Sequence, residues 1–498
     1  MLPIDVPRNL EAQPRRHRFW RRRSRPKVVM LVYNTVEHDA RVRRSARSLA
    51  RAGCEVTVLG VAREGDSTTR SWEGFELRLV PRRDPLVERD RRARHRADVL
   101  GERRERIRGR VRGLRDREAS LGLALRFVVR AGRKLYEWRL RRVQLGRESA
   151  RETVAEAREA KTRRARRDPL GLHTYEKTWW PIVRRLRPDV VHVHDAHGLL
   201  VARRAADRGA RWIFDAHEDP LKKGGEEEGR DEVIRREVAR HLPHADAVIT
   251  VSAPLAERLR RTFHLRRQPT LVHNTPALHG PALTRQPGLR ELAGVGPDTA
   301  LVVYAGSMTR RRKISVVLEA LEHLEETHLA LVVSPDNSVV LETVDLAERL
   351  GVGDRVHVVP KVPPEELVEF LSEADVGVHP LSRYSNADIA LPNKLFEYLH
   401  AGLPVVVSEC PAMASFVRRH GLGEIAPVDD SAAWAEAIDS ALRNSSYRER
   451  VEDLETLREE WSWERQEDEL LDVYRQVLEP DFAREAPALR LPVAAGAP

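Results

Sequence analysis

The stretch Leu391–Val406, LPNKLFEYLHAGLPVV, predicts a short helix that turns directly into an apolar strand. Pro392 suits the first turn of this helix, where a missing amide hydrogen costs nothing. Gly402 can adopt the left-handed conformation that ends many helices, and Pro404 keeps the helix from continuing. A helix that feeds directly into a strand is the repeating unit of a layered α/β fold.

The same alternation of strand and helix runs through most of the chain. Apolar segments typical of buried parallel strands lie at 27–33, 54–60, 189–194, 211–217, 246–252, 269–274, 299–306, 328–334, 355–360, 374–380 and 403–409. Helical patterns separate them, which predicts two doubly wound parallel-sheet domains in tandem. The expected organisation is a basic disordered tail over 1–26, a first α/β domain over 27–275, a Pro- and Gly-rich linker over 276–298, a second α/β domain over 299–460, a helix over 461–479 and a disordered tail over 480–498.

The bulk composition excludes several classes of protein. Of 498 residues, 41 % are hydrophobic, which is too many for a disordered chain. No run of about 18 uncharged apolar residues could span a membrane, and the basic N-terminus lacks the apolar core of a signal peptide. We therefore expect a cytoplasmic protein, free or at the inner face of the cell membrane, with Cys54 and Cys410 reduced. The net charge of +11 favours anionic partners.

An Arg-rich segment at about 82–170 interrupts the first domain and has the pattern of long helices. A helix over 123–143 would place two kinds of side chain on different sides: basic Arg126, Arg130, Arg133, Lys134 and Arg141 on one, and apolar Ala124, Val128, Ala131, Leu135 and Trp138 on another. Such a helix can make a peripheral contact with an anionic membrane. It can equally pack its apolar side on the first domain, or simply present a solvated charged surface.

Two basic features at the carboxyl edge of the second sheet are candidates for anion binding. In the helix that starts near Pro392, free backbone amides, Lys394 and Glu397 would face the end of the preceding strand. Gly306 ends the first strand of this domain, and four cations, Arg310–Lys313, follow it. A nucleoside diphosphate fits this pair of features. The alternatives are an i,i+3 surface ion pair between Lys394 and Glu397 and a solvated loop for the cations.

A histidine-rich pattern ends two strands of the first domain. His192 and His194 alternate along one strand and so share a face, and Asp195 and His217 follow at the ends of adjacent strands. Three interpretations stay open: a metal site, a polar wall that faces a substrate, and histidines with a structural role.

Together these segments resemble the GT-B glycosyltransferases, and specifically the retaining enzymes of glycosyltransferase family four, also called glycosyl transferases group 1. The resemblance rests on HDARVRRSARSLARAGCEVTVL, PDVVHVHDAH, DAHED, ADAVITVS, LVHNTP, YAGSMTRRRK and LPNKLFEYLHAGLPVV in this order, and it covers about 27–80 and 175–478. It implies two Rossmann-like domains that face each other across a cleft, with the acceptor on the first domain and a nucleoside-diphosphate sugar on the second. The helix over 461–479 would cross back onto the first domain.

The resemblance also implies roles for single residues. The donor would contact Gly306, Arg312, Lys313, Asn393, Lys394 and Glu397; the acceptor side would contact His38, Asp39, Arg41, His217 and Glu218; His194 and Asp195 would serve the reaction itself. The family moves a sugar with retention and generally without a metal, because helix dipoles and basic side chains stabilise the leaving diphosphate. No cofactor, metal or nucleic acid is therefore expected. The expected partners are a nucleotide sugar and a carbohydrate or lipid-linked acceptor, in the synthesis of cell-envelope polysaccharide, glycolipid or related glycoconjugates.

The chain departs from the family pattern at several positions. Ile389 stands where a second glutamate, eight residues before Glu397, is frequent. YNTVEHD replaces the usual glycine pair after the first strand, Ser307 stands where arginine is common, and Lys313 where glycine is common. A GT-B protein that binds nucleotide without catalysis is therefore one alternative. A metal-dependent hydrolase built on HVHDAH and a nucleic-acid-binding protein are two others.

Overall fold

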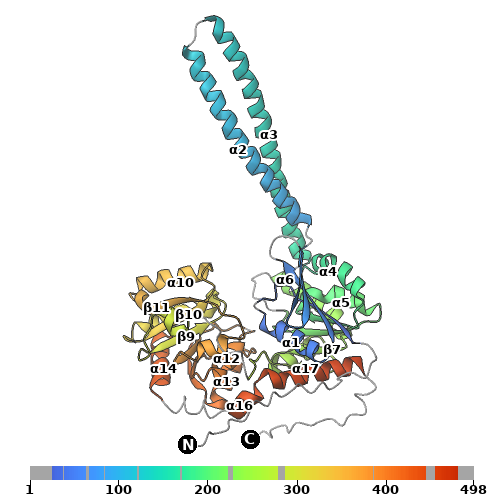
Figure 1. The fold of residues 1–498 in the computed structure, drawn as a ribbon, viewed down its shortest axis with the longest axis vertical. Helices are drawn as coiled ribbons and strands as arrows, with labels where there is room; N and C mark the ends of the chain where they lie inside the picture. Colours follow the sequence, from blue (N-terminus) through green and yellow to red (C-terminus); the bar gives the residue numbers. More distant parts are fainter. Residues whose placement is uncertain are drawn as a thin grey trace, which may run out of the picture.

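The computed structural model describes residues 25–37, 39–62, 67–82, 85–120, 123–168, 171–221, 228–278, 287–384, 386–444 and 455–479. Two α/β bodies lie side by side, and a long helical hairpin projects from one of them (Figure 1). The expectation of two doubly wound α/β domains is therefore confirmed. Most of the expected tail over 1–26, all of the tail over 480–498, and residues 279–286 of the expected linker lie outside the described residues.

An eight-stranded sheet forms the centre of the N-terminal domain. Its strands are β1 (Lys27–Leu31), β2 (Glu55–Ala62), β3 (Thr68–Trp72), β4 (Phe75–Pro81), β5 (Val190–His194), β6 (Arg211–Ala216), β7 (Ala247–Thr250) and β8 (Thr270–Leu271). They lie in the order β3-β4-β2-β1-β5-β6-β7-β8, and neighbours are parallel except the edge pair β3 and β4. The chain order reverses between β1 and β5, and in open α/β sheets ligands bind at the carboxyl ends of the strands at such a point.

A six-stranded parallel sheet forms the C-terminal domain. Its strands are β9 (Leu301–Ala305), β10 (His328–Val333), β11 (Val356–Pro360), β12 (Val376–His379), β13 (Val405–Ser408) and β14 (Gly423–Ala426). The order is β11-β10-β9-β12-β13-β14, so the reversal here lies between β9 and β12. This is the strand order of a Rossmann-like domain.

Helices cover the sheets of both domains (Figure 1). The N-terminal domain has α1 (Ala40–Arg51), α4 (Leu172–Leu186), α5 (Leu199–Ala206), α6 (Glu228–His241) and α7 (Ala253–Thr262). The C-terminal domain has α8 (Leu289–Ala293), α9 (Ile314–Leu321), α10 (Ser338–Arg349), α11 (Leu367–Leu371), α12 (Asn393–His400), α13 (Pro411–His420) and α14 (Ser431–Arg443). In α1, Val42, Ala46 and Leu49 are fully buried, because their spacing places them on one side of the helix.

Two further helices, α16 (Glu455–Glu460) and α17 (Trp463–Leu478), return the chain to the N-terminal domain. Trp463, Leu470 and Tyr474 of α17 belong to the same buried apolar cluster as the inner face of α1. The indole Nε1 of Trp463 donates a hydrogen bond to Ser48 Oγ at 3.0 Å. The last helix is therefore an integral part of the core of the first domain, although it starts 412 positions after the end of α1.

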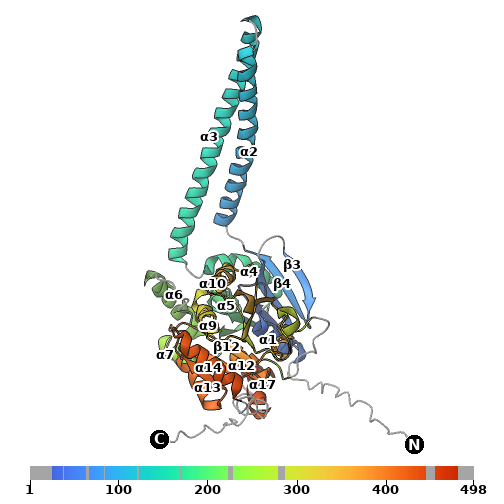
Figure 2. The ribbon, with the colours of Figure 1, turned by 90° about the vertical axis from the view of Figure 1, so that its left-hand side faces the viewer.

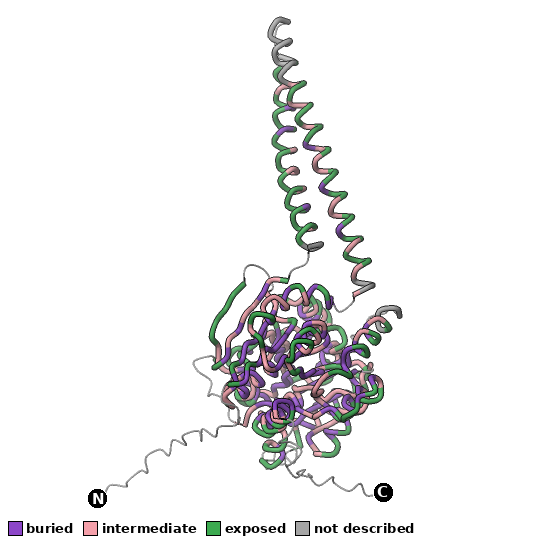
Figure 3. Tube along the Cα trace, turned by 90° about the vertical axis from the view of Figure 1, so that its right-hand side faces the viewer, coloured by how far each residue is buried: buried purple, intermediate pink, exposed green. Residues whose placement is uncertain are grey.

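The hairpin consists of α2 (Pro85–Ser120) and α3 (Leu123–Arg167), and it points away from both sheets (Figures 1 and 2). Ile107, Val111 and Val143 are buried between the two helices. Figure 3 shows mostly exposed and half-buried residues along the rest of the described hairpin. α3 therefore packs on α2, and the alternative in which Leu135 and Trp138 pack on the first domain is wrong.

The strand predictions missed β3, β4 and β14. β3 is an exposed strand, and its sequence lacks the apolar run that marks a buried strand. At the other edge, the predicted strand over 269–274 shortens to β8, because the backbone amide of His273 donates to Gln466 of α17 at 2.8 Å instead. Within the described residues, no helix is both long enough and apolar enough to cross a membrane.

Candidate active site

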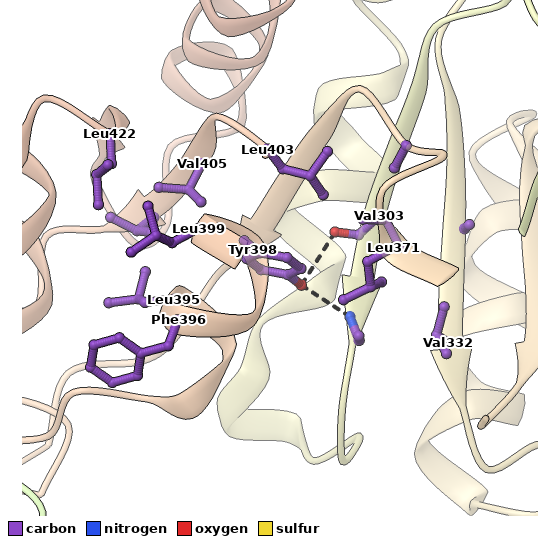
Figure 4. Close-up of a cluster of buried hydrophobic side chains, with 14 of the residues drawn as sticks. Val303, Val332, Leu371, Leu395, Phe396, Tyr398, Leu399, Leu403, Val405 and Leu422 are labelled. Atoms are coloured by element: carbon purple, nitrogen blue, oxygen red, sulfur yellow. Dashed lines mark hydrogen bonds between the residues drawn. The ribbon is translucent and has the colours of Figure 1, made fainter. Parts of the chain in front are cut away.

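Helix α12 brings its polar residues to the reversal point of the second sheet. Its apolar face packs into the core as the spacing predicts, with Leu395, Phe396 and Leu399 buried (Figure 4). Beneath it, the hydroxyl of Tyr398 accepts a hydrogen bond from the backbone amide of Ala305 at 3.1 Å and lies 3.4 Å from the carbonyl oxygen of Val303 (Figure 4). α12 is thus tied directly to the end of β9.

Gly306, the residue after β9, allows the lysine of α12 to approach the strand end. Its φ is 145°, which a residue with a side chain rarely adopts. A Cβ at this position would lie 3.0 Å from Cε of Lys394, closer than an ordinary carbon–carbon contact. Glycine therefore suits this position for two reasons: it can adopt the backbone conformation, and it leaves room for the side chain of Lys394.

A cleft of about 230 Å³ opens between these elements and the N-terminal domain. Its walls include Gly306, Ser307, Arg312, Lys361, His379, Asn393, Lys394 and Glu397 from the C-terminal domain, and Ala40 from α1. Five of the six residues predicted to contact the donor therefore lie together. The sixth, Lys313, is not among the residues that line this cleft.

Glu397 accepts hydrogen bonds from two other residues in the polar wall of this cleft. Lys394 Nζ donates to its Oε2 at 2.7 Å, and Asn393 Nδ2 donates to its Oε1 at 3.1 Å. The i,i+3 ion pair considered as an alternative is thus present, but it lines the cleft rather than an exposed helix surface. Because each carboxylate oxygen can accept more than one hydrogen bond, Glu397 can still bind hydroxyl groups of a ligand.

Arg312 enters the cleft from the loop after β9, where Arg310–Arg312 form a short 3-10 helix. Its Nη1 lies 3.0 Å from Nε2 of His379, the last residue of β12. Burial, followed by the charges of Arg312 and Lys394, holds the pKa of His379 well below its ordinary value. His379 is therefore neutral at neutral pH and can accept the hydrogen bond that orients the guanidinium.

Lys361 is a cleft residue that the sequence analysis missed. It follows β11 directly, so its position at the carboxyl end of a strand was the available signal. Burial, and then the charge of Lys394, lowers the pKa of its ammonium group. Two lysines that repel each other in one cleft indicate that a bound anion would relieve the repulsion.

Lys313 adopts a left-handed backbone conformation, with φ 45°, at the end of the 3-10 helix. Glycine adopts this conformation without cost, which explains why glycine is common at the corresponding position of the family. The ammonium group of Lys313 pairs with Asp429 at 2.7 Å. Its contact with a donor stays a prediction.

Several of the predicted residues of the first domain belong to a second charged cluster around Asp215, in β6. Arg41 Nε and Nη2 each donate to one oxygen of this carboxylate at 2.8 Å, and its Nη1 donates to the carbonyl oxygen of Val272. The two side chains are only 2 % and 1 % exposed. Arg41 is therefore fully engaged within the protein, and its contact with an acceptor stays a prediction.

Three histidines surround the same carboxylate. His192 Nδ1 lies 2.8 Å from the hydroxyl of Tyr474, and His194 Nδ1 lies 3.0 Å from Nε2 of His217. Burial, and then His192, lowers the pKa of His194 to about 3. Burial works against a charge on His217, but Asp215 and Asp195 outweigh it and raise the pKa of His217 to about 9.

These protonation states fix the direction of the hydrogen bond between the two rings. The charged His217 donates from Nε2, and the neutral His194 accepts at Nδ1. His194 then carries its own proton on Nε2, and this buried atom has no hydrogen-bond partner among the described residues. His194 is 1 % exposed and is not among the residues that line the donor cleft, so its role in the reaction stays a prediction.

Three side chains in this cluster could bind a metal ion, but the positive charges beside them disfavour a cation. Ligand atoms of His192, His194 and Asp215 lie within 4.8 Å of one another. Both oxygens of Asp215 are already bonded to Arg41, and His217 beside them is cationic. Because a divalent ion would meet two positive charges here, the cluster fits a polar wall better than a metal site.

The remaining predicted residues have different surroundings. His38 lies outside the described residues, and Glu218 is exposed. Asp39 caps α1 by accepting from the backbone amide of Val42 at 3.2 Å. Asp195 has φ 57°, a strained conformation for a residue other than glycine, and strained residues concentrate at functional sites.

Ile389, which stands in place of the frequent glutamate, contacts the other domain. It packs on the apolar cluster of the N-terminal domain, and its carbonyl oxygen accepts from Ser252 Oγ at 2.8 Å. In the same loop, Asn386 Oδ1 accepts from the backbone amide of Asp219 at 3.3 Å. This loop therefore joins the two domains beside the cleft.

Two family models match the chain and divide it as the two sheets do. Residues 40–275 match the model described as Glycosyltransferase Family 4, and residues 290–454 match the model described as Glycosyl transferases group 1. Two Rossmann-like domains that enclose a cationic cleft define the GT-B class of glycosyltransferases. Within this class, the chain belongs to the group 1 glycosyltransferases.

Curated relatives and solved structures agree with this assignment. D-inositol 3-phosphate glycosyltransferase of Xylanimonas cellulosilytica is 29 % identical over 214 residues, which are 42 % of this chain and 50 % of the relative. The protein of the same name from Mycobacterium marinum is 27 % identical over 323 residues, 61 % of this chain and 63 % of the relative. The chain thus spans less than two thirds of the length of these curated relatives.

Two solved structures are similar in fold. Sucrose-phosphate synthase of Thermosynechococcus elongatus has a TM-score of 0.59 at 18 % identity, over 91 % of this chain and 100 % of that chain. HepE of Anabaena in complex with UDP-glucose has a TM-score of 0.57 at 12 % identity, also over 91 % of this chain and 100 % of that chain. At such identities the similarity establishes the fold alone.

Proposed function

We propose that this glycosyltransferase moves a sugar from a nucleoside-diphosphate sugar to an acceptor hydroxyl with retention of the anomeric configuration. The observation that carries the proposal is the convergence of Arg312, Lys394 and Glu397 on one cleft beside Gly306. Point charges and a carboxylate at the end of a parallel strand match a diphosphate that is joined to a ribose.

In the proposed complex the diphosphate lies against Arg312, Lys361 and Lys394, near the amino end of α12. The ribose hydroxyls donate to Glu397, which keeps acceptor capacity beyond its bonds to Asn393 and Lys394. The bound diphosphate relieves the repulsion between the two lysines. We propose that no metal ion is required, because these cations stabilise the leaving diphosphate in its place.

The reaction then needs little covalent participation by the protein. The bond between the anomeric carbon and the leaving phosphate oxygen breaks, and a bond to the acceptor oxygen forms on the same face. The acceptor proton passes to the departing phosphate. The protein contributes positioning and charge stabilisation. We propose that the buried Nε2–H of His194, which has no hydrogen-bond partner among the described residues, binds a hydroxyl of the transferred sugar.

The relatives suggest which ligands to test first. Solved structures of similar fold hold UDP and UDP-glucose, so a UDP-sugar is the first donor candidate. The curated relatives are named for inositol 3-phosphate, which makes a small phosphorylated acceptor a candidate beside a carbohydrate or lipid-linked acceptor. A role in making cell-envelope polysaccharide or glycolipid, at the inner face of the membrane, is part of the proposal.

Isothermal titration with UDP, GDP, ADP and dTDP tests the donor site. We expect selective binding of one nucleotide, with affinity about 10- to 100-fold weaker in Glu397→Gln, since a charged hydrogen bond to the ribose is weakened. Glu342→Gln is the matched control, because Glu342 is exposed on α10 and pairs with Arg310 outside the cleft. No binding by any nucleotide, or equal binding by both variants, would contradict the proposal.

Product analysis separates the enzyme from its alternatives. The anomeric configuration of the product by NMR tests retention. A protein that binds the nucleotide but neither transfers nor hydrolyses the sugar would be the catalytically inactive alternative. Activity that is lost on chelation and restored by zinc would favour the hydrolase that uses the cluster around Asp215.

A further inference from the structure

The helical hairpin carries a surface that the proposed transferase site does not use. α2 and α3 bury Ile107, Val111 and Val143 along the seam between them. Outside this seam, three large apolar side chains of α3 face solvent: Leu135 is 50 %, Trp138 is 55 % and Leu145 is 66 % exposed. They lie at the distal half of a structure that stands clear of both domains (Figure 2).

These three side chains form a row along one side of α3, which we call the apolar row. Trp138 and Leu145 are two helical turns apart, and Leu135 precedes Trp138 by three residues, a spacing that keeps all three on one side. By contrast, the exposed Leu292 and Leu341 of the C-terminal domain sit singly on α8 and α10. Single exposed leucines are ordinary, but a row with a tryptophan indicates an interaction surface.

The apolar row is surrounded by an unusual excess of positive charge. Residues 85–167 contain 28 Arg and Lys against 12 Asp and Glu, a net charge of +16 that exceeds the +11 of the whole chain. Over 106–142 the imbalance is 13 basic to 3 acidic residues. Arg142 stacks over the ring of Trp138 at 5.3 Å, so charge and apolar surface meet in one place.

This charge decides among the candidate partners. A second copy of the hairpin would bring another +16 against the first, so self-association through the row is disfavoured. Nucleic acid would match the charge, but strand binding relies on repeated aromatic stacking, and 85–167 contain only Phe127, Tyr136 and Trp138. An anionic lipid surface matches both properties, because its headgroups attract arginine and its interface accepts Leu and Trp.

We propose that the apolar row and the arginines around it dock the protein on an anionic lipid bilayer. Trp138, with its indole and its long apolar surface, would sit at the headgroup level, and Leu135 and Leu145 would enter the boundary of the acyl chains. Trp138 lies 29 residues before the end of α3, which is roughly 40 Å along the helix axis. The docking site is thus far from the donor cleft. It assigns a surface to the membrane location that is part of the proposed function, and nucleotide binding does not depend on it.

Vesicle sedimentation of the full chain tests this inference. We expect binding to vesicles of phosphatidylcholine with about one third phosphatidylglycerol, weak binding to phosphatidylcholine alone, and loss of binding at high salt. The triple variant Leu135→Ser/Trp138→Ser/Leu145→Ser should bind the anionic vesicles at least about tenfold more weakly. The control Leu292→Ser/Leu341→Ser, which removes exposed leucines of the C-terminal domain, should bind like the wild type.

The outcomes that overturn the proposal are specific. Equal binding by the triple variant and the wild type, or equal binding to neutral and anionic vesicles, would show that the row is not the docking surface. Light scattering that reveals a dimer, and a monomer in the triple variant, would assign the row to a second copy. If the triple variant loses helix content by circular dichroism, Trp138→Ser alone provides the test. Nucleotide affinity should be unchanged in every variant.

Discussion

Charged clusters lie at the carboxyl ends of both sheets, and they use their charges differently. In the N-terminal domain, Asp215 and Arg41 are almost fully buried and bond each other through both carboxylate oxygens. In the C-terminal domain, Arg312, Lys394 and Glu397 line a cleft and keep capacity for a ligand. The first cluster is bonded within the protein, and the second lines a cleft.

The difference shows that residue type does not separate structural from ligand-binding charges. Both clusters combine carboxylates with cations, and both occupy the point where the strand order reverses. Charges in both clusters are paired within the protein, but Arg41 and Asp215 are enclosed by it, whereas Lys394 and Glu397 line a cleft. A buried pair that loses one member leaves an uncompensated charge, whereas a group on a cleft wall can be solvated.

The largest expected effect is the loss of folding stability when the buried pair of Arg41 and Asp215 is broken. Asp215→Ala leaves the guanidinium of Arg41 buried without its partner, and we expect it to lower the free energy of unfolding by about 3–5 kcal/mol. Glu397→Ala should cost about 1 kcal/mol or less, because Lys394 can turn into the cleft and be hydrated. Urea denaturation of both variants measures the contrast.

The double variant Arg41→Met/Asp215→Leu is the control for this contrast. It removes both charges and should recover much of the stability that Asp215→Ala loses, since the pair itself contributes little net stability. Similar losses in Asp215→Ala and Glu397→Ala would contradict the distinction between the two clusters.

The next effect is a pH dependence of stability that is specific to the first cluster. The pKa of His217 in the fold is about 9, above the ordinary value, so its contribution is complete below about pH 6.5 and is lost as the pH rises through 9. This loss is at most about 3 kcal/mol. Melting temperatures between pH 6.5 and 9 should fall more steeply in the wild type than in His217→Gln.

His194 provides the control with the opposite sign. Its pKa is lowered to about 3, so the fold keeps it neutral while the unfolded chain takes up a proton. Its presence therefore lowers stability as the pH falls below about 6.5. His194→Gln should reduce the acid sensitivity and leave the alkaline limb unchanged. Parallel pH profiles for the two variants would argue against this assignment of charges.

A smaller effect separates two lysines near the donor cleft. Lys361→Met should weaken binding of the nucleoside diphosphate by roughly tenfold, because Lys361 lines the cleft. Lys313→Met is the matched control and should change affinity by less than about twofold, since Lys313 is paired with Asp429. Titration of both variants with the preferred nucleotide decides between them, and a stronger effect of Lys313→Met would restore the sequence-based assignment.

The fold was predictable because its signals are local. The apolar runs and the helix stop at Gly402 follow from the sequence, and the structure contains the predicted helix and strand as α12 and β13. Edge strands such as β3 were missed, because an exposed strand needs no apolar run. The return of α17 to the first domain depended on the family resemblance, since no local signal links Trp463 to Ser48.

The site was predictable in part for a similar reason. Gly306, Arg312 and Lys394 follow strand ends, and strand ends meet at one edge of a parallel sheet. Lys361 also follows a strand end, but no other basic residue lies next to it in the sequence, so it was not predicted as a site residue. The pairing of Arg41 with Asp215 joins residues 174 positions apart, and only the packed structure reveals it.

The smallest effect concerns the support beneath the donor cleft. Tyr398→Phe removes the hydroxyl that accepts from the buried amide of Ala305, and we expect a loss of about 1 kcal/mol in unfolding free energy. Nucleotide affinity should fall by less than about threefold, because Lys394 and Glu397 stay on the same helix. Denaturation and titration of this variant measure the two effects. A large loss of nucleotide affinity with unchanged stability would mean that the geometry of the donor cleft depends directly on the Tyr398 hydroxyl. The charges of Lys394 and Glu397 would then be coupled to the core as tightly as those around Asp215.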